Sequence, residues 1–261
     1  MLQTWLHALP FLLGAGFLTW LVSVQLRNVT IVDTLWSLMF VIAAFSYAAT
    51  TLPPGPRAQL VLVLVTVWGL RLAIYLGRRN FGHEEDRRYQ KIRRRNEPGF
   101  AWKSLYLVFG LQAVLAWVIS LPLLGAIAGD ASPLGWLDYA GAALCLVGLY
   151  FEAVGDWQLT RFKANPANAG RVMDQGLWGL TRHPNYFGDF CVWWGFGLVA
   201  LAAGAWWSLI GPALMSVLLL EVSRVPLLEK DTAQRRPAYR DYIARTNAFF
   251  PGPRRTGTAA R

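Results

Sequence analysis

The apolar residues of this chain fall into long runs separated by short polar segments. A run of about 20 apolar residues is long enough to cross the hydrocarbon core of a bilayer as a helix. The segments between the runs contain Pro, Gly and polar residues that end helices, as in TLPPGPR at 51–57. The pattern predicts an all-α integral membrane protein with seven transmembrane helices, at 5–26, 30–51, 58–77, 102–127, 134–154, 185–203 and 205–223.

Positive charge gathers in alternate connections between these runs. Eight Lys and Arg residues lie between positions 78 and 95, and four lie between 161 and 182. Cytoplasmic loops of membrane proteins carry such an excess, so we expect the N-terminus outside and the C-terminus in the cytoplasm, with Arg57 as the basic residue left outside. The same rule accounts for the net charge of +10 without a nucleic-acid partner.

The composition excludes several other classes of protein. The chain is 55% hydrophobic and 15% charged, whereas about a quarter of an ordinary soluble domain is charged. Cys145 and Cys191 both lie in apolar runs, which argues against a disulfide framework. The three histidines are far apart and have no helical partner, so we expect no metal site.

We expect residues 1–250 to form a single membrane domain. Its cytoplasmic loops at 78–101 and 155–184, together with a tail helix within 224–250, would form the mouth of a cofactor site. Residues 251–261 (PGPRRTGTAAR) lack periodicity and predict a disordered tail. No internal repeat is visible, which argues against a secondary transporter.

Polar residues inside the second and third runs are candidates for chemistry. Asp33 lies near the start of the second run, where a carboxyl in a dry pocket could stay protonated and donate a hydrogen bond; a hydrated helix end is the alternative. Trp68, Arg71 and Tyr75 share one face of the third helix. Arg71 could bind an anionic ligand. Alternatively it has a structural role, in which its side chain extends towards the cytoplasm or pairs with a carboxylate. Tyr75 is either a proton donor or an interfacial packing residue.

The end of the fifth run carries a second polar stripe. Glu152, Asp156 and Lys163 recur at helical spacing, so they share one face at the cytoplasmic mouth. Asp156 could hold the ribose or amide end of a nucleotide while Lys163 meets a phosphate. The alternative is a solvated helix end.

The third cluster is the stretch GLWGLTRHPNYFGDFCVWWG at 176–195, where polar residues run directly into an apolar helix. Pro184 suits a first helical turn, and a helix N-terminus can bind phosphate. The tail adds Arg and Tyr residues on a short amphipathic helix, which could equally lie on an anionic membrane. The candidate residues are Arg182, His183, Asn185, Tyr186, Asp189, Arg224, Glu229, Tyr239, Tyr242 and Arg245.

Several of these runs resemble one known family. LTRHPNYFGDFCVWWG, EVSRVPLLEKD and YRDYIARTNAFFP look like the C-terminal half of the steroid 5α-reductase family, and VDTLWS and YLGRRNFGHEEDRRYQKIR are similar to its bacterial branch. The resemblance covers the chain from about residue 27. A more distant likeness includes sterol C14-reductases and isoprenylcysteine carboxyl methyltransferase.

The resemblance implies a seven-helix reductase of the bacterial inner membrane, acting as a monomer. It would use NADPH to reduce the C=C bond of a 3-oxo-Δ4 steroid or similar lipophilic enone that enters from the bilayer. Asp33 stands at the family's catalytic Glu, Trp68 replaces its catalytic Tyr, and Tyr75 matches a second Tyr. The resemblance places Asn185 at the nicotinamide amide. The other residues assigned to the cofactor are Arg71, Arg79, Asp156, Lys163, Arg182, His183, Tyr186, Asp189, Arg224, Glu229, Tyr239, Tyr242 and Arg245.

Two other functions fit parts of the sequence. A membrane methyltransferase that uses S-adenosylmethionine on a lipophilic substrate would share the turn before the sixth helix and the Arg and Glu of the tail. A non-catalytic lipid-binding or transport protein would need no cofactor, and it leaves the inward polar residues unexplained. A strong requirement for the Arg and Lys cluster would favour NADPH, because S-adenosylmethionine carries no phosphate.

Overall fold

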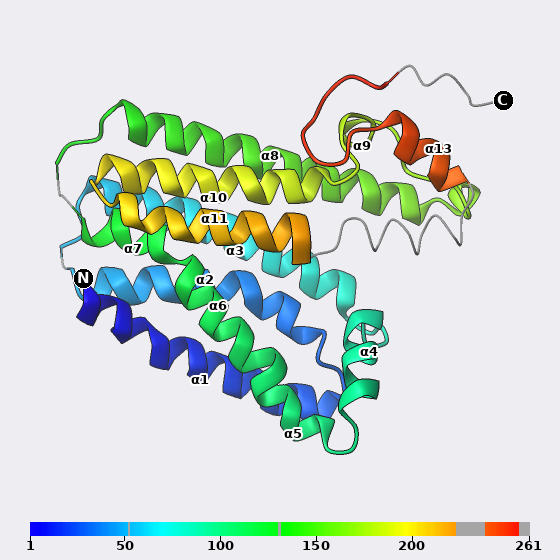
Figure 1. Ribbon diagram of the computed structural model, residues 1–261, viewed down its shortest axis with the longest axis horizontal. Helices are drawn as coiled ribbons and strands as arrows, with labels where there is room; N and C mark the ends of the chain where they lie inside the picture. The colour runs from blue at the N-terminus through cyan, green and yellow to red at the C-terminus, as the bar shows by residue number, and fades with distance from the viewer. Residues whose placement is uncertain (52, 130–131, 223–237, 256–261) are drawn as a thin grey trace. The chain divides into compact units, whose positions relative to one another are not determined.

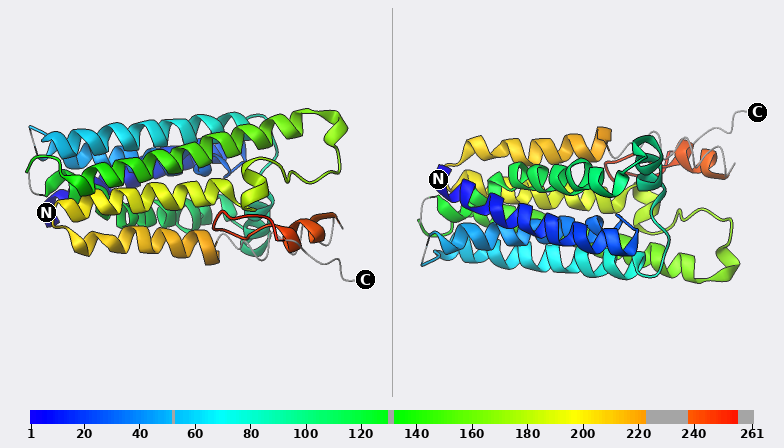
Figure 2. Two further views of the ribbon diagram at one scale, coloured as in Figure 1. Left: turned by 90° about the horizontal axis from the view of Figure 1, so that it is seen from above. Right: turned by 90° about the horizontal axis from the view of Figure 1, so that it is seen from below.

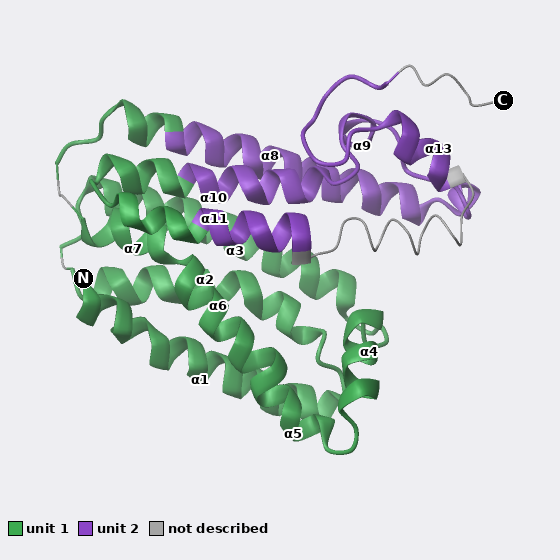
Figure 3. Ribbon diagram, in the orientation of Figure 1, with its two compact units in different colours: residues 1–140, 196–211 green, residues 141–195, 212–261 purple. Residues whose placement is uncertain are grey.

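The computed structural model describes all residues except 52, 130–131, 223–237 and 256–261. The described residues form helices joined by turns and loops, without a strand among them, which confirms the all-α prediction. The chain divides into two compact units (Figure 3). Unit 1 comprises residues 1–140 and 196–211, and unit 2 comprises residues 141–195 and 212–261. Each unit contains helices from distant parts of the chain.

Unit 1 consists mainly of long apolar helices (Figure 1). A Cβ added to Gly69 would lie 2.6 Å from Val41, so glycine allows α2 and α3 to approach closely. The hydroxyl of Ser37 donates to the carbonyl of Gly69 at this crossing (2.9 Å). The elements are α1 (Leu2–Leu26), α2 (Ile31–Ala49), α3 (Pro56–Asn80), α4 (Arg87–Asn96), α5 (Phe100–Ser104), the π-helix η1 (Leu105–Gly110), α6 (Leu111–Ile119), α7 (Leu121–Ala128) and the 3-10 helix η3 (Trp206–Leu209).

Unit 2 is organised around two neighbouring helices, α8 (Trp136–Ala164) and α10 (Pro184–Ala202), which run side by side (Figure 2). Their glycines face each other: a Cβ on Gly188 would lie 2.6 Å from the carbonyl oxygen of Gly148. Small residues at a crossing let two helix backbones approach closely, as in membrane helix pairs. The other elements are η2 (Pro166–Asn168), α9 (Leu177–Leu180), α11 (Ile210–Val217), the π-helix η4 (Leu218–Val222) and α13 (Ala238–Arg245).

Among the described residues, five helical segments are long and apolar enough to cross a membrane, as in a multi-pass membrane protein. They are α1, α2, α3, the continuous helix Phe100–Ile119 and α8. Helices also occupy the predicted sixth and seventh runs, as α10 and as η3, α11 and η4.

Two predicted boundaries differ from the structure. The fourth run breaks at Ser120, since Pro122 lies in the first turn of α7 and favours a new helix there. The fifth helix continues past the predicted end at 154 to Ala164, because the next proline is Pro166.

Candidate functional site

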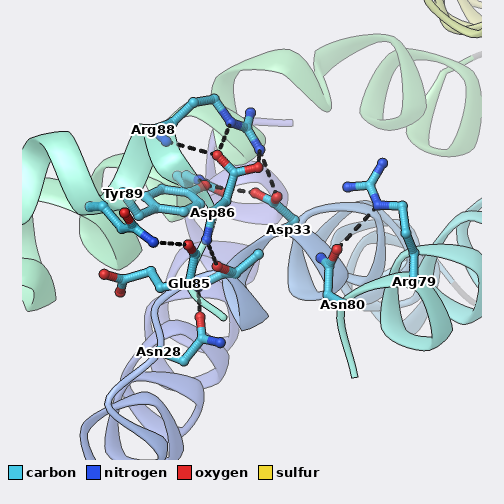
Figure 4. A network of polar contacts seen from close by, with 11 residues as sticks. Asn28, Asp33, Arg79, Asn80, Glu85, Asp86, Arg88 and Tyr89 are labelled. Carbon is cyan, nitrogen blue, oxygen red and sulfur yellow. Dashed lines mark hydrogen bonds and ion pairs between the residues drawn. The ribbon is translucent and has the colours of Figure 1, made fainter. Parts of the chain in front are cut away.

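One end of unit 1 carries a network of polar residues (Figure 4). It joins the turn between α1 and α2 to the segment that precedes α4. The amide of Val29 donates to Glu85 (3.0 Å), and the hydroxyl of Thr30 accepts from the amide of Asp86 (2.8 Å). Asp86 also caps α4 by accepting from the amide of Arg88 (2.8 Å). The cap fixes the direction in which α4 leaves this turn.

Asp33 lies within this network, in the first turn of α2. Its carboxyl accepts a hydrogen bond from the Tyr89 hydroxyl (2.6 Å) and one from the Arg88 guanidinium (2.9 Å). Arg88 is about half exposed and also binds Asp86. We expected an acid in a dry pocket, whereas the structure places the Asp33 carboxyl beside a guanidinium at the edge of the unit. Asp33 therefore acts as a hydrogen-bond acceptor here.

The pKa values of Tyr89, Glu85 and Asp86 are shifted in different directions. Burial and the neighbouring Asp33 charge both raise the pKa of Tyr89, so this side chain keeps its proton. Burial also raises the pKa of Glu85, but the hydrogen bonds from Arg93 and Val29 outweigh it and leave the pKa below its ordinary value. Asp86 behaves similarly, with Arg88 as the main partner that lowers its pKa against burial. The proton of the Asp33–Tyr89 pair thus lies on the Tyr89 oxygen.

The predicted residues of α3 differ in their surroundings. Trp68 is 1% exposed and its ring centroid lies 5.8 Å from that of Phe40, so it is a core residue of unit 1. Tyr75 is partly buried, with the guanidinium of Arg79 over its ring at 5.8 Å. The charge of Arg79 lowers the pKa of Asp86, which places Arg79 beside the network. Arg71 lies one turn before Tyr75 and is partly buried.

Unit 2 contains buried carboxyl groups that lie against the start of α10. Glu152 and Asp156 are 2% and 4% exposed. A Cβ on Gly188 would lie 2.7 Å from Cγ of Glu152, and one on Gly155 would lie 3.2 Å from Pro184. The first turns of α10, which carry the predicted residues Asn185, Tyr186 and Asp189, therefore lie on the turns of α8 that carry the two acids. Ionisable groups buried within apolar helices are costly and mark functional sites.

Two residues predicted to bind cofactor hold the C-terminal segment in place. The guanidinium of Arg182 donates to the carbonyls of Ile243 (3.0 Å) and Thr246. The Tyr242 hydroxyl donates to the carbonyl of Trp178 (2.6 Å), and its side chain is buried. These contacts give Arg182 and Tyr242 the role of positioning residues.

The other predicted residues of unit 2 lie nearer its surface. The ring of His183 stacks on that of Tyr186, with centroids 5.4 Å apart. Lys163 is exposed at the end of α8. Arg245 is also exposed and lies 3.6 Å from Asp174, and Tyr239 contacts the ring of Tyr242. Arg224 and Glu229 lie outside the described residues.

The predicted disordered tail is partly wrong. The amide of Gly252 donates to the carbonyl of Leu180 (3.1 Å), and that of Arg255 donates to the carbonyl of Arg245 (2.9 Å). The guanidinium of Arg254 binds the carbonyl of Asp174. These bonds hold residues 251–255 against unit 2, and residues 256–261 lie outside the described chain.

Unit 2 also contains an open cavity of about 410 Å³. Trp157 and Arg161, whose guanidinium lies 5.5 Å from the Trp157 ring, form part of its wall. Helical spacing puts these two residues on a different face of α8 from Asp156 and Lys163. The predicted cofactor residues are not in its lining, which is Trp157, Gln158, Arg161, Phe162, Asn165, Asn168, Met173, Gln175 and Gly176.

Sequence reasoning missed several residues of unit 1. Tyr89, Arg88 and Glu85 were read only as part of a basic cytoplasmic segment, although three acids directly before an Arg-rich run are a helix-capping signal. Arg57 was expected in an outside loop, whereas it is buried and pairs with the buried Asp138 (2.7 Å). Arg57 and Asp138 lie far apart in the sequence, so local spacing could not predict that they pair.

Cys145 and Cys191 are free and buried. Within the described ranges, no group of three or more His, Cys, Asp or Glu side chains gathers in a way that could hold a metal ion.

These features define an all-helical, multi-pass membrane protein with an ion-paired network in one unit and buried carboxyls in the other. The chain belongs to the family described as "Protein of unknown function (DUF1295)", which matches residues 19–246. It is 24% identical to an uncharacterized protein of Schizosaccharomyces pombe, over 93% of this chain and 80% of that protein. No solved structure matches the chain.

Proposed function

We propose that the protein is an NADPH-dependent reductase of the C=C bond of a lipophilic enone, such as a 3-oxo-Δ4 steroid. The observation that carries the proposal is the pair of buried carboxyls, Glu152 and Asp156, packed against the start of α10 by glycine contacts. Ionisable side chains inside apolar helices are costly and occur most often at functional sites. The resemblance of the surrounding motifs to steroid 5α-reductases supplies the class of reaction.

The donors and acceptors of unit 2 fit a dinucleotide. The carboxyls of Glu152 and Asp156 can accept hydrogen bonds from ribose hydroxyls or a carboxamide. The exposed Lys163 and Arg245 can meet phosphates at the surface of the same unit. The amide oxygen of Asn185 accepts from the amide of Tyr186 (3.1 Å), which leaves its NH2 group as a donor. NADPH, when bound, supplies the hydride for the enone.

For the acid of the reaction, the resemblance points to Asp33, which lies in the network of unit 1. Asp33 keeps the place that the resemblance gives it, and Tyr89 holds the proton of the pair at its hydroxyl oxygen. An enolate is basic enough to take a proton from a phenol, and the Arg88 guanidinium would then offset part of the negative charge left on Tyr89 and Asp33. In this proposal Asp33 acts together with Tyr89 in place of a lone neutral carboxylic acid. Tyr75, bordering the network through Arg79, is the second hydroxyl at this end.

We also propose that all seven apolar segments cross the bacterial inner membrane, with the N-terminus outside. The distribution of Lys and Arg supports this orientation. The network and α4 would then lie at the cytoplasmic surface. Cysteine-accessibility labelling after substitution at Gly14, near mid-span, and at Arg94, on α4, checks it: only Arg94→Cys should react, and only from the cytoplasmic side.

The experiment that tests the reaction is NADPH oxidation by purified, detergent-solubilised protein with progesterone as the trial enone. We expect substrate-dependent loss of NADPH absorbance and a 5α-dihydro product. Binding of S-adenosylmethionine without binding of NADPH would replace the reductase by a methyltransferase. Binding of neither would favour a non-catalytic lipid-binding protein.

A matched pair of variants locates the cofactor. Asn185→Ala should weaken NADPH binding by about tenfold, the typical effect of losing one hydrogen bond from a buried site. Gln175→Ala removes an exposed amide of the same unit and should leave binding unchanged. Equal affinities for the two variants would remove Asn185 from the cofactor site.

A further inference from the structure

The basic residues of α4 are sorted between two faces. Arg87, Lys91, Arg94 and Arg95 recur at i, i+4, i+7 and i+8, so they share one face, and all four are exposed. In the described part of the chain, their side chains form no ion pair with an acid. This set is called the outer stripe below.

The opposite face of α4 is packed and paired. Tyr89 and Ile92 lie in a core cluster with Trp20, Val32 and Phe100. The cations on this side have partners: Arg93 binds Glu85 (2.8 Å), and its guanidinium lies 4.6 Å from the ring of Phe100. Arg88, between the two faces, binds Asp33 and Asp86. The structure therefore neutralises the inner cations and leaves the outer stripe with its charge.

Large apolar side chains are exposed in the segments that flank α4. Phe81 is 86% exposed and Trp102 is 72% exposed, on either side of α4 in the chain. In Figure 1, α4 is turned across the direction of α2 and α3, at the end where α3 finishes. Aromatic side chains beside a row of cations are typical of a surface that meets lipid headgroups.

We propose that the outer stripe of α4 is a binding surface for anionic phospholipid headgroups. The argument rests on charge complementarity: four exposed cations, which pair with no acid among the described residues, lie at the end of a membrane-embedded unit and are flanked in the chain by exposed aromatic residues. Phosphate and glycerol headgroups with net negative charge fit the stripe, whereas zwitterionic phosphatidylcholine does not. This inference does not depend on the reaction proposed above.

Lipid bound here would also hold the inner face in place, because both faces belong to one short helix. A ligand that binds only the folded α4 stabilises it by mass action. The contacts of Arg88 and Tyr89 to Asp33 would then be stabilised by anionic lipid.

The test is native mass spectrometry of the detergent-solubilised full chain, titrated separately with phosphatidylglycerol and phosphatidylcholine. Each cation near an anionic surface strengthens binding by about fivefold, so we expect at least a tenfold preference of the wild type for phosphatidylglycerol. The variant Arg87→Gln, Lys91→Gln, Arg94→Gln, Arg95→Gln should lose this preference. A control variant removes four exposed cations of unit 2, through Arg161→Gln, Arg171→Gln, Arg240→Gln and Arg255→Gln, and should retain it.

Three results would overturn the proposal: no preference in the wild type, an undiminished preference in the α4 variant, or an equal loss in the control variant. Displacement of phosphatidylglycerol by millimolar inorganic phosphate would identify a site for free anions instead of a lipid surface. If the quadruple variant does not fold, Lys91→Glu alone should lower the preference severalfold, and an unchanged preference would again contradict the proposal.

Discussion

Two Arg–Asp pairs of unit 1, Arg57–Asp138 and Arg88–Asp33, have opposite character. Arg57 and Asp138 are almost completely buried, with side chains 4% and 0% exposed, and Asp138 also accepts from the amide of Gly135 (2.8 Å). In the Arg88–Asp33 pair the guanidinium is 54% exposed, and it is shared with Asp86. The first pair is enclosed by apolar helices, whereas the second lies in a network that water can reach.

The difference determines how strongly a substitution at each pair should affect stability. Removing one partner of a buried pair leaves an unpaired charge in a medium that solvates it poorly, which destabilises the fold. An exposed pair contributes little to stability because water solvates either partner alone. A substitution at Arg88–Asp33 should therefore leave the fold intact, so its effect on the proposed reaction can be measured separately.

The largest effect is expected at the buried pair. Asp138→Ala leaves Arg57 without its carboxylate and should lower the free energy of unfolding by about 3 to 5 kcal/mol. Denaturant or SDS titration of the purified protein measures it. The double variant Arg57→Met, Asp138→Leu removes both charges and should recover most of the loss. A double variant as unstable as Asp138→Ala would show that the pair itself, rather than an unpaired charge, determines stability.

A smaller effect is expected at Glu85, which lies between the two extremes. Glu85 accepts from Arg93 and from the amide of Val29, and its folded pKa lies below the ordinary value of 4.5. Its contribution is therefore present above about pH 4.5 and is lost as the pH falls through the lowered folded value. Glu85→Gln should cost about 1 to 2 kcal/mol at neutral pH.

The pH dependence provides the check. The difference in stability between Glu85→Gln and the wild type should shrink as the pH is lowered below 4.5, because the wild-type carboxyl then becomes protonated. A difference that is constant with pH would mean that the charge of Glu85 contributes nothing to the network.

At the exposed pair, stability and activity should separate. Arg88→Gln should change the free energy of unfolding by no more than about 1 kcal/mol, yet NADPH-dependent turnover should fall by about 100-fold if Asp33 and Tyr89 act together. Thermal unfolding and enone reduction measure the two effects. Measured in detergent without added anionic lipid, the exposed Arg87→Gln, one residue away, is the control and should leave both unchanged. Full activity of Arg88→Gln would remove this network from the reaction.

The smallest effect is expected at Arg27, in the turn beneath the network. Arg27 ends α1 with a left-handed backbone (φ 50°), which favours glycine. Arg27→Gly relieves this strain but gives the unfolded chain more freedom, so we expect stability to change by less than about 1 kcal/mol, in the stabilising direction. A clear loss of stability would mean that the Arg27 side chain belongs to the network.

Much of the fold could be predicted from the pattern of apolar residues. Each of the seven predicted segments contains helix, because a helix lets an apolar run satisfy its backbone hydrogen bonds internally in an apolar environment. Helical spacing likewise predicted that Glu152, Asp156 and Lys163 share one face of a single helix, and α8 carries all three. The exit of the fourth helix was misplaced because one proline starts a new helix there.

The partners of individual side chains could not be predicted in this way. Asp33 and Arg88 are 55 positions apart and Arg57 and Asp138 are 81 apart, and local periodicity carries no information over such separations. The sequence alone determined a helical membrane protein with charge concentrated at defined segments, because hydrophobicity and spacing act locally. Only the tertiary structure decided which charges are neutralised. The packing of α1, α2 and α4 places Arg88 and Tyr89 against Asp33, and it leaves the outer stripe of α4 exposed.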